Sequence, residues 1–178
     1  MQKANFRDYL KLHFIVVILG FTAILGKLTA VSSPALVFYR TLFAAFGIGV
    51  LAISQNSNLK IGFKKALPLL GVGTLMSFHW ICFFGSAKLS TVAISLVAVS
   101  TTAFFTSLIE PLFKQKKVSF IEVMLGIVVV IGLALIFAFE FKHFEGLMVG
   151  LLSAFIASIF SILNSQFAFQ YESRQVIF

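Results

Sequence analysis

The stretch "SSPALVFYRTLFAAFGIGVLAI", residues 32–53, decides the fold, because it is long enough to cross a membrane and carries a single charged residue, Arg40. A helix rises about 1.5 Å per residue, so about 20 apolar residues cross the roughly 30 Å of hydrocarbon in a bilayer. A permanent positive charge is costly at that depth. The stretch therefore predicts a membrane-spanning helix in which Arg40 has a defined role.

The composition of the whole chain agrees with a membrane protein. Of its 178 residues, 60% are hydrophobic and only 11% are charged, and the mean hydropathy is +1.04. Soluble domains are about 45–50% apolar, so this chain carries more apolar surface than a soluble core can bury. The loops between its apolar runs are short, which leaves no room for a soluble catalytic domain.

Six apolar runs of membrane-spanning length follow one another along the chain. They cover residues 10–30, 35–54, 66–87, 91–113, 118–139 and 146–169. Each run must be helical, since a backbone exposed to lipid has to satisfy its own hydrogen bonds, and the alternating pattern of a membrane β-barrel is absent. We therefore predict an all-α fold, a polytopic membrane helical bundle of six transmembrane helices.

The distribution of lysine and arginine predicts the orientation of the bundle, because cytoplasmic loops retain positive charge. With the N-terminus in the cytoplasm, ten basic residues fall inside and three fall outside. The inside residues are Lys3, Arg7, Lys11, Lys60, Lys64, Lys65, Lys114, Lys116, Lys117 and Arg174, and the outside residues are Lys27, Lys88 and Lys142. Topology therefore accounts for most of the net charge of +8, and nucleic-acid binding is not needed to explain it.

Polar residues recur on one face of three predicted spans. In the fourth span the face contains Thr91, Ser95, Thr102, Thr106 and Glu110; in the sixth, Ser153, Ala157, Ser161 and Asn164; in the first, Thr22, Gly26, Thr29 and Ser33. Such faces either hydrogen-bond to neighbouring helices or line a polar path, and packing is the commoner use of Ser and Thr. The candidate cavity residues are Thr22, Thr29, His79, Trp80, Ser95, Thr102, Thr106, Ser161 and Asn164.

Two ionisable residues in the spans allow a structural or a functional interpretation. Arg40 lies about 8 Å below the outer end of the second span, so its side chain either reaches the interface or faces a cavity. Glu110 ends the fourth span next to Lys114, where a local ion pair or an interfacial carboxylate is expected rather than a proton site. His79, near the middle of the membrane, needs a partner whether it is a packed residue or carries a proton or contacts a ligand.

Enzyme signatures are absent from the sequence. There is no GxSxG, no P-loop, no metal-spaced His and Glu cluster, and no pair of carboxylates at depth on one helix face. We therefore expect no enzymatic activity, no catalytic residues, no metal and no cofactor. The close spacing of Gly146 and Gly150 forms GxxxG, a signal for helix packing.

Three stretches resemble the ten-span EamA family of the drug/metabolite transporter superfamily. They are "SSPALVFYRTLFAAF" (32–46), "HWICFFGSAKLSTVAISLV" (79–97) and "SLIEPLFKQKKVSFIEVMLGIVVVIGLALI" (107–136). The resemblance implies a carrier in the cell (inner) membrane that moves a small solute by alternating access, without ATP hydrolysis. It also implies two inverted five-span repeats around a central cavity.

The resemblance assigns residues to parts of that architecture. Arg40 and Glu110 match the family's second-span arginine and the glutamate that ends its fourth span, and we expect Arg40 to be structural. Arg40→Leu should then lower folded yield more than apparent substrate affinity. Residues 1–145 would form the first repeat and 146–178 the start of a second, truncated one.

The chain departs from the family pattern in two places. Members of the family often carry a proline in the fourth span, where this chain has "VSTTAFF", so Thr101 or Thr102 stands near that position. A ten-span carrier would continue through four more spans, so we expect the coding frame to run on past Phe178. If the chain ends there, a homodimer or an inactive product is expected. The alternative class is a six-span scaffold or assembly subunit with a dry interior.

The expected partners are thus the lipid bilayer and a small-molecule substrate, with no nucleic acid. Substrate, direction of transport and coupling ion are not encoded in any motif of this sequence.

Overall fold

The computed structural model describes residues 5–55, 62–115, 117–138 and 141–167, which are almost entirely helical and contain no strand. The helices are α1 (Phe6–Leu28), α2 (Ser33–Ser54), α3 (Phe63–Leu89), α4 (Val92–Ser100), α5 (Thr102–Lys114), α6 (Phe120–Phe137) and α7 (Phe144–Phe167), with a short 3₁₀ turn, η1 (Phe141–His143), before α7. Six helical segments are long and apolar enough to cross a membrane, α4 and α5 together forming one of them. The predicted all-α bundle of six spans is therefore confirmed.

The ends of several helices differ from the predicted spans, and at α1 the difference comes from a side-chain cap. The first helix begins at Phe6, four residues before the predicted span. Asn5 and Asp8 form a capping box there, in which the Asn5 side chain accepts from the Phe6 N–H at 3.0 Å and Asp8 accepts from the Asn5 N–H at 3.0 Å. Capping satisfies the free backbone N–H groups at the start of a helix, and a hydropathy pattern contains no information about such hydrogen bonds. The predicted start of the first span, residue 10, was therefore too late in the chain.

The predicted fourth span is two helices rather than one. The break lies at Thr101, and three consecutive hydroxyls bond carbonyl oxygens three residues earlier: Ser100 to Val97, Thr101 to Ala98 and Thr102 to Val99, each at 2.6 Å. Side-chain bonds of this kind compete with the helical ladder and bend helices. The chain therefore interrupts this span without a proline, at the Thr101–Thr102 pair of "VSTTAFF".

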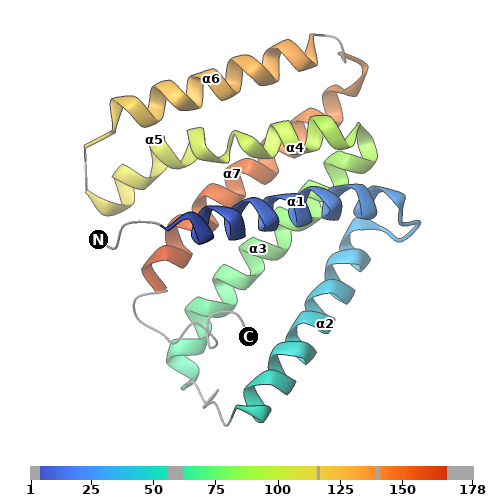
Figure 1. The fold of residues 1–178 in the computed structure, drawn as a ribbon, viewed down its shortest axis with the longest axis vertical. Helices are drawn as coiled ribbons and strands as arrows, with labels where there is room; N and C mark the ends of the chain where they lie inside the picture. Colours follow the sequence, from blue (N-terminus) through green and yellow to red (C-terminus); the bar gives the residue numbers. More distant parts are fainter. Residues whose placement is uncertain (1–4, 56–61, 116, 139–140, 168–178) are drawn as a thin grey trace.

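The core of the bundle is the packing of α7 against α3, α4 and α5. Figure 1 shows α7 passing behind α4 and running beside α3, and among the candidate spans α7 has the largest buried share. Most of its buried residues are small, among them Gly146, Gly150, Ser153, Ala154 and Ala157, and the larger ones are Leu147 and Ile162. Small side chains let helix backbones approach closely, which is how helices pack when there is no water to drive them together.

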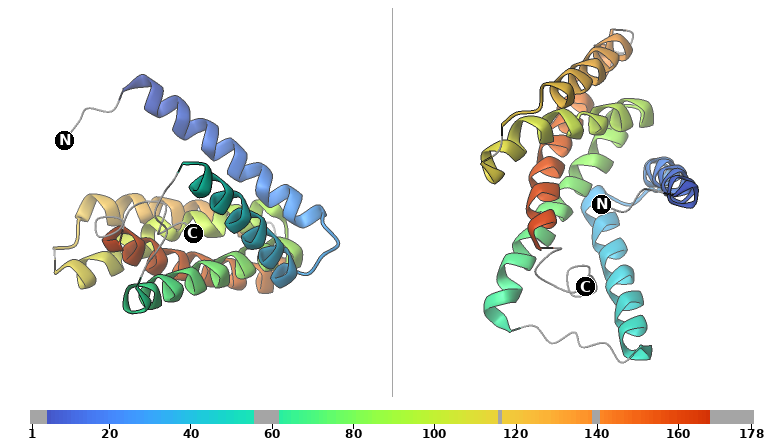
Figure 2. Two further views of the ribbon diagram at one scale, coloured as in Figure 1. Left: turned by 90° about the horizontal axis from the view of Figure 1, so that it is seen from below. Right: turned by 60° about the vertical axis from the view of Figure 1, so that its left-hand side comes forward.

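The first two helices are the most loosely attached. The principal contacts of α1 are with α3 and α4, and that of α2 is with α3. Figure 1 shows the links 29–32 and 90–91 at the right, on the side where α7 begins, whereas the other ends of α1 and α2 point away from each other. Figure 2 shows the same divergence from two other directions. The helices thus converge at the end predicted to face outward and spread toward the other end.

Candidate functional site

The polar centre of the bundle lies between α3 and α7, at His79 and Ser153. His79 is only 8% exposed, and its Nδ1 lies 3.0 Å from the carbonyl oxygen of Ser153 and 2.9 Å from Ser153 Oγ. The Ser153 hydroxyl lies 2.9 Å from the His79 carbonyl oxygen, to which it donates. In the tautomer that carries its proton on Nδ1, the ring donates to α7 while α7 donates back to α3. This arrangement satisfies a buried histidine and ties the two helices together.

An aromatic cluster continues from His79 toward α2. The ring centroids of His79 and Trp80 are 5.1 Å apart, and Trp80 lies 5.4 Å from Phe83 and 5.6 Å from Phe84. Phe84 is almost completely buried, and it packs with Phe83, Ala23 and Val37 in one core cluster. We call His79, Trp80, Phe83 and Phe84 the aromatic cluster. It joins residues of α3 to α1 and α2.

Arg40 stacks on this cluster from α2. Its guanidinium carbon lies 3.8 Å from the centroid of the Trp80 ring, a cation–π contact. Trp80 is about 13 Å from the end of α3 at 1.5 Å per residue, whereas Arg40 is about 10 Å from the start of α2. The Arg40 side chain is therefore directed across to Trp80 of α3.

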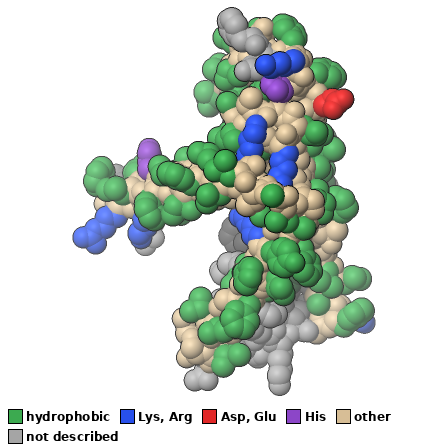
Figure 3. Space-filling view, turned by 90° about the vertical axis from the view of Figure 1, so that its right-hand side faces the viewer, with side chains coloured by type: hydrophobic (Ala, Val, Ile, Leu, Met, Phe, Trp, Pro, Cys, Tyr) green, Lys and Arg blue, Asp and Glu red, His purple; other side chains and the backbone are tan. Residues whose placement is uncertain are grey.

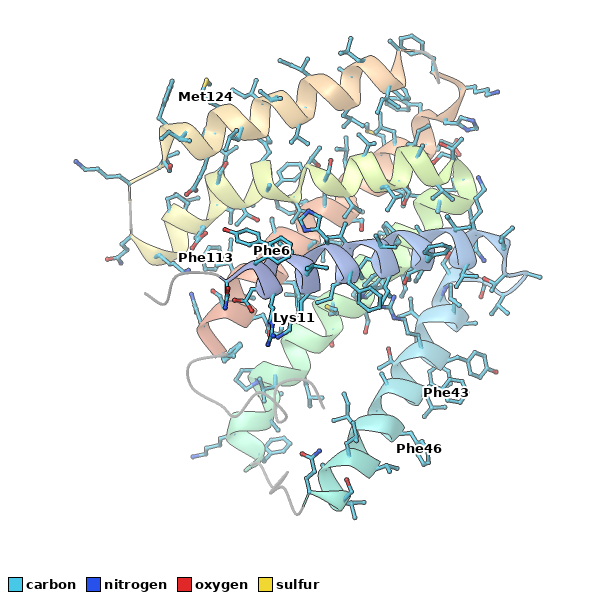
Figure 4. The ribbon with its side chains drawn as sticks, in the orientation of Figure 1. Phe6, Lys11, Phe43, Phe46, Phe113 and Met124 are labelled. Carbon is cyan, nitrogen blue, oxygen red and sulfur yellow. The ribbon has the colours of Figure 1, made fainter. Side chains whose placement is uncertain are left out.

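The lipid-facing side of α2 lies away from α3. Figure 4 shows Phe43 and Phe46 on the side of α2 that points away from α3, and these side chains are 70% and 71% exposed. Ser33, Val37 and Ala52 are the buried residues of the same helix. At 100° per residue, Arg40 falls between these two faces. It is thus placed at the border of the α2–α3 contact, where it remains exposed.

The hydroxyls of the predicted polar face in the fourth span are bonded within the protein. Ser95 is fully buried and donates to the Phe83 carbonyl oxygen of α3 at 3.0 Å, and Thr106 donates to Thr102 at 2.8 Å. Thr91 accepts from the Ile94 N–H as the N-cap of α4. Glu110 pairs with Lys114 at 2.5 Å, the local ion pair that its position suggested. These contacts are typical of helix packing.

The candidates on the first and sixth spans lie in two different places. Thr22 and Thr29 are one turn on either side of Gly26, which lies against Phe84, and both donate to carbonyl oxygens of their own helix, at 3.1 Å and 2.9 Å. Ser161 is exposed and Asn164 is half-buried on α7. They follow Ser153 by about 12 Å and 16 Å along the helix, so they are not neighbours of His79.

Two lysines at the converging ends were assigned by sequence to topology alone, yet they join the links between helices. Lys27 donates to the carbonyl oxygen of Ser90, and Lys88 donates to those of Thr29, at 3.2 Å, and Val31. We call Lys27 and Lys88 the lysine clamp. Figure 3 views this end of the molecule, where Lys and Arg side chains gather in the middle of a largely hydrophobic surface. No sequence pattern pairs a lysine with a distant backbone carbonyl, so these contacts could not be predicted from the sequence.

The fold and these contacts define a class of protein: an integral membrane protein that crosses the bilayer several times and keeps a few polar side chains among its helices. Within the described ranges, no three His, Cys, Asp or Glu side chains are grouped to hold a metal ion.

Comparison with known families identifies the chain more closely. The model of the EamA-like transporter family matches residues 9–138, which is most of the chain, so this protein belongs to the EamA-like transporter family. The matched region ends before α7 begins at Phe144. No curated protein and no solved structure matches the chain. Membership indicates a transporter-like role for small solutes.

Proposed function

We propose that the chain forms part of a secondary transporter that moves a small solute by alternating access, and that it is not an enzyme. In this proposal residues 1–145 are the first five-helix repeat and 146–178 begin a second. The protein lies in the inner membrane of the cell, with its N-terminus in the cytoplasm. Family membership supports the transporter class. The positive charge bias supports the orientation.

One structural observation carries the mechanism, namely that the two ends of the bundle are packed differently. At the predicted outer end, the lysine clamp connects the turn after α1 to α3 and the turn after α3 to α1. At the predicted inner end, α1 and α2 diverge from the rest. A carrier that alternates access must close one end while the other is open, and this asymmetry is what an inward-facing arrangement requires.

A second observation favours the alternative, a scaffold with a dry interior. The hydroxyls of Ser95, Thr102 and Thr106 all have partners inside the protein, so they need no water. The two functions therefore differ in whether water reaches this face of α4 and α5.

Thiol accessibility separates the two functions. Cys82 is the only cysteine, so Cys82→Ala provides a background for single cysteines. Thr106→Cys lies about 12 Å from the end of α5, and Val128→Cys lies at the same distance from the start of α6 but is 65% exposed on the outside of the bundle. A membrane-impermeant thiol reagent applied from the cytoplasmic side should label Thr106→Cys and leave Val128→Cys unlabelled.

Protection of both positions would contradict the transporter proposal and favour the scaffold. Labelling of both would mean that the reagent reaches lipid-facing positions at this depth, and labelling of Thr106→Cys would then not support a water-filled path.

A further inference from the structure

The guanidinium of Arg40 lies at membrane depth without a hydrogen-bond acceptor among the described residues. Within that part of the chain, the guanidinium contacts the face of Trp80 and lies near the His79 ring, and it makes no hydrogen bond or ion pair. A guanidinium has five N–H donors in its plane, and a ring face above that plane does not accept them. Leaving such donors unpaired in hydrocarbon is costly. Water, a lipid headgroup or a ligand must therefore meet the free edge of Arg40.

The charge of Arg40 is also uncompensated. The carboxylates in the described ranges lie near helix ends: Asp8, Glu122 and Glu145 in the first turns of α1, α6 and α7, and Glu110 in its pair with Lys114. None of them is recorded within ion-pair distance of Arg40. The other described cations likewise lie toward the ends of their helices, so this site would accept one negative charge.

The surroundings of the guanidinium are apolar apart from His79. Val37 and Phe83 are buried beside Trp80, and Leu36 packs against the same cluster. Arg40 itself stays exposed on the border of the α2–α3 contact, where the helices diverge toward the predicted inner end (Figure 1). A ligand that approaches from that end would meet a planar donor edge backed by aromatic and aliphatic side chains.

The sequence led us to expect a structural role for Arg40; from its contact with Trp80 we propose instead that Arg40, held flat against that ring, binds the carboxylate of an apolar monocarboxylate solute. The planar edge of a guanidinium matches a carboxylate with two parallel hydrogen bonds, and the stacking on Trp80 fixes the plane before the ligand arrives. The apolar part of the solute lies against Trp80 and Leu36, which are only partly buried beside the cluster. That the bound carboxylate is also the transported solute rests on the function proposed above. That Arg40 binds a carboxylate does not depend on that function.

Trp80 makes the site directly observable, because it is the only tryptophan of the chain. The probe is cyclohexanecarboxylate, an apolar monocarboxylate that does not absorb where tryptophan is excited, and its control is the uncharged cyclohexanecarboxamide. With the purified 178-residue protein in phosphatidylcholine nanodiscs, the carboxylate should shift Trp80 emission saturably. The amide should leave it unchanged. Equal responses to both compounds would overturn the proposal.

Substitution provides the second arm. Arg40→Gln should weaken the carboxylate response at least tenfold, whereas Lys142→Gln, which removes the same charge from an exposed turn, should leave it unchanged. If Arg40→Gln fails to fold, collisional quenching of Trp80 fluorescence in the unaltered protein tests the site instead. Iodide, an anion, should quench Trp80 more strongly than caesium, a cation. Quenching by neither ion, or more by caesium, would contradict an accessible anion site at Arg40.

The two experiments distinguish failure of the carboxylate site from failure of the proposed transport function. Carboxylate binding together with protection of Thr106→Cys would support the site and count against transport. Labelling of Thr106→Cys without a carboxylate-specific Trp80 response would leave transport standing and overturn this inference.

Discussion

Glycines at the helix contacts show how single residues set the packing. A Cβ at Gly26 would lie 2.3 Å from the Phe84 ring, and at Gly146 it would lie 2.4 Å from Ser90 Cβ. At Gly126 the nearest backbone atom, Phe104 Cα, would be 2.9 Å away. Each distance is shorter than van der Waals contact, so the close approach of the helices depends on the missing side chain.

Gly150→Ala should destabilise the bundle. The new methyl group would lie 2.7 Å from Ala98 Cβ and 2.8 Å from Ser86 Oγ, so α7 must move away from α3 and α4. Overpacking of this kind costs about 1–3 kcal/mol. Reversible denaturant unfolding in micelles should show a lower free energy of unfolding. At Gly132 nothing lies within 4 Å of the added Cβ, so Gly132→Ala should instead raise the free energy of unfolding by about 0.5–1 kcal/mol. Equal changes in the two variants would contradict the close contact at Gly150.

At the scale of elements, the contact between α3 and α7 is a polar seam as well as a close one. The Ser86 hydroxyl donates to the Gly146 carbonyl oxygen at 2.6 Å, in addition to the His79–Ser153 contacts. The apolar lipid does not press these helices together, so hydrogen bonds and close packing must hold them. The seam explains why α7 is the most buried span.

The His79–Ser153 contact should be measurable as a coupling energy. A double-mutant cycle with His79→Leu and Ser153→Ala should give a coupling of about 0.6 kcal/mol and at most about 1.7 kcal/mol, the range for hydrogen bonds between membrane helices. The free energy of unfolding in micelles is the readout. Ser77→Ala is the control, because Ser77 donates within α3, to Gly73 at 3.0 Å, and should not couple to Ser153→Ala. An equal coupling for Ser77 would refute the seam.

At the scale of the whole molecule, the proposed orientation rests on the distribution of charge rather than on packing. With the N-terminus inside, Lys117 follows α5 on the cytoplasmic side and Lys142 lies in the turn before α7 on the other side. In the Cys82→Ala background, an impermeant thiol reagent added outside intact cells should label Lys142→Cys and not Lys117→Cys. The reverse pattern would invert the proposed topology.

The lysine clamp should hold the predicted outer end closed. Replacing Lys27 and Lys88 together by Gln removes the ammonium groups that donate to Ser90, Thr29 and Val31. Spin labels on Ala30→Cys and Leu89→Cys should then show a longer and broader distance distribution by pulsed electron resonance. Lys142→Gln is the matched control. An unchanged distribution in the double variant would mean that helix packing alone closes this end.

Much of the architecture was predictable from the sequence, because the bilayer imposes a length and a composition on every span. All six spans and the absence of strands in the described ranges followed from apolar runs of about 20 residues. The Glu110–Lys114 pair followed from their spacing of four on one helix. The motifs around Arg40 and Glu110 were also enough to indicate the family, which the match over residues 9–138 establishes.

The candidate site was less predictable, because contacts between helices depend on how each helix is rotated. Residues on one face in the sequence separated in space: Ser153 bonds His79 inside the seam, whereas Ser161, on the same predicted face of α7, is exposed. The lysine clamp involves backbone carbonyl oxygens, which every residue carries and no pattern distinguishes.

The sequence by itself determined that this protein crosses the membrane, how many times within the described chain, and which family it belongs to, because hydropathy and local motifs act over a few tens of residues. The tertiary structure alone decided that Arg40 lies on Trp80 with a free donor edge, that His79 is satisfied by α7, and that one end of the bundle is clamped. Each of these depends on side chains from different helices, whose relative rotation and depth are set by close packing of the whole bundle.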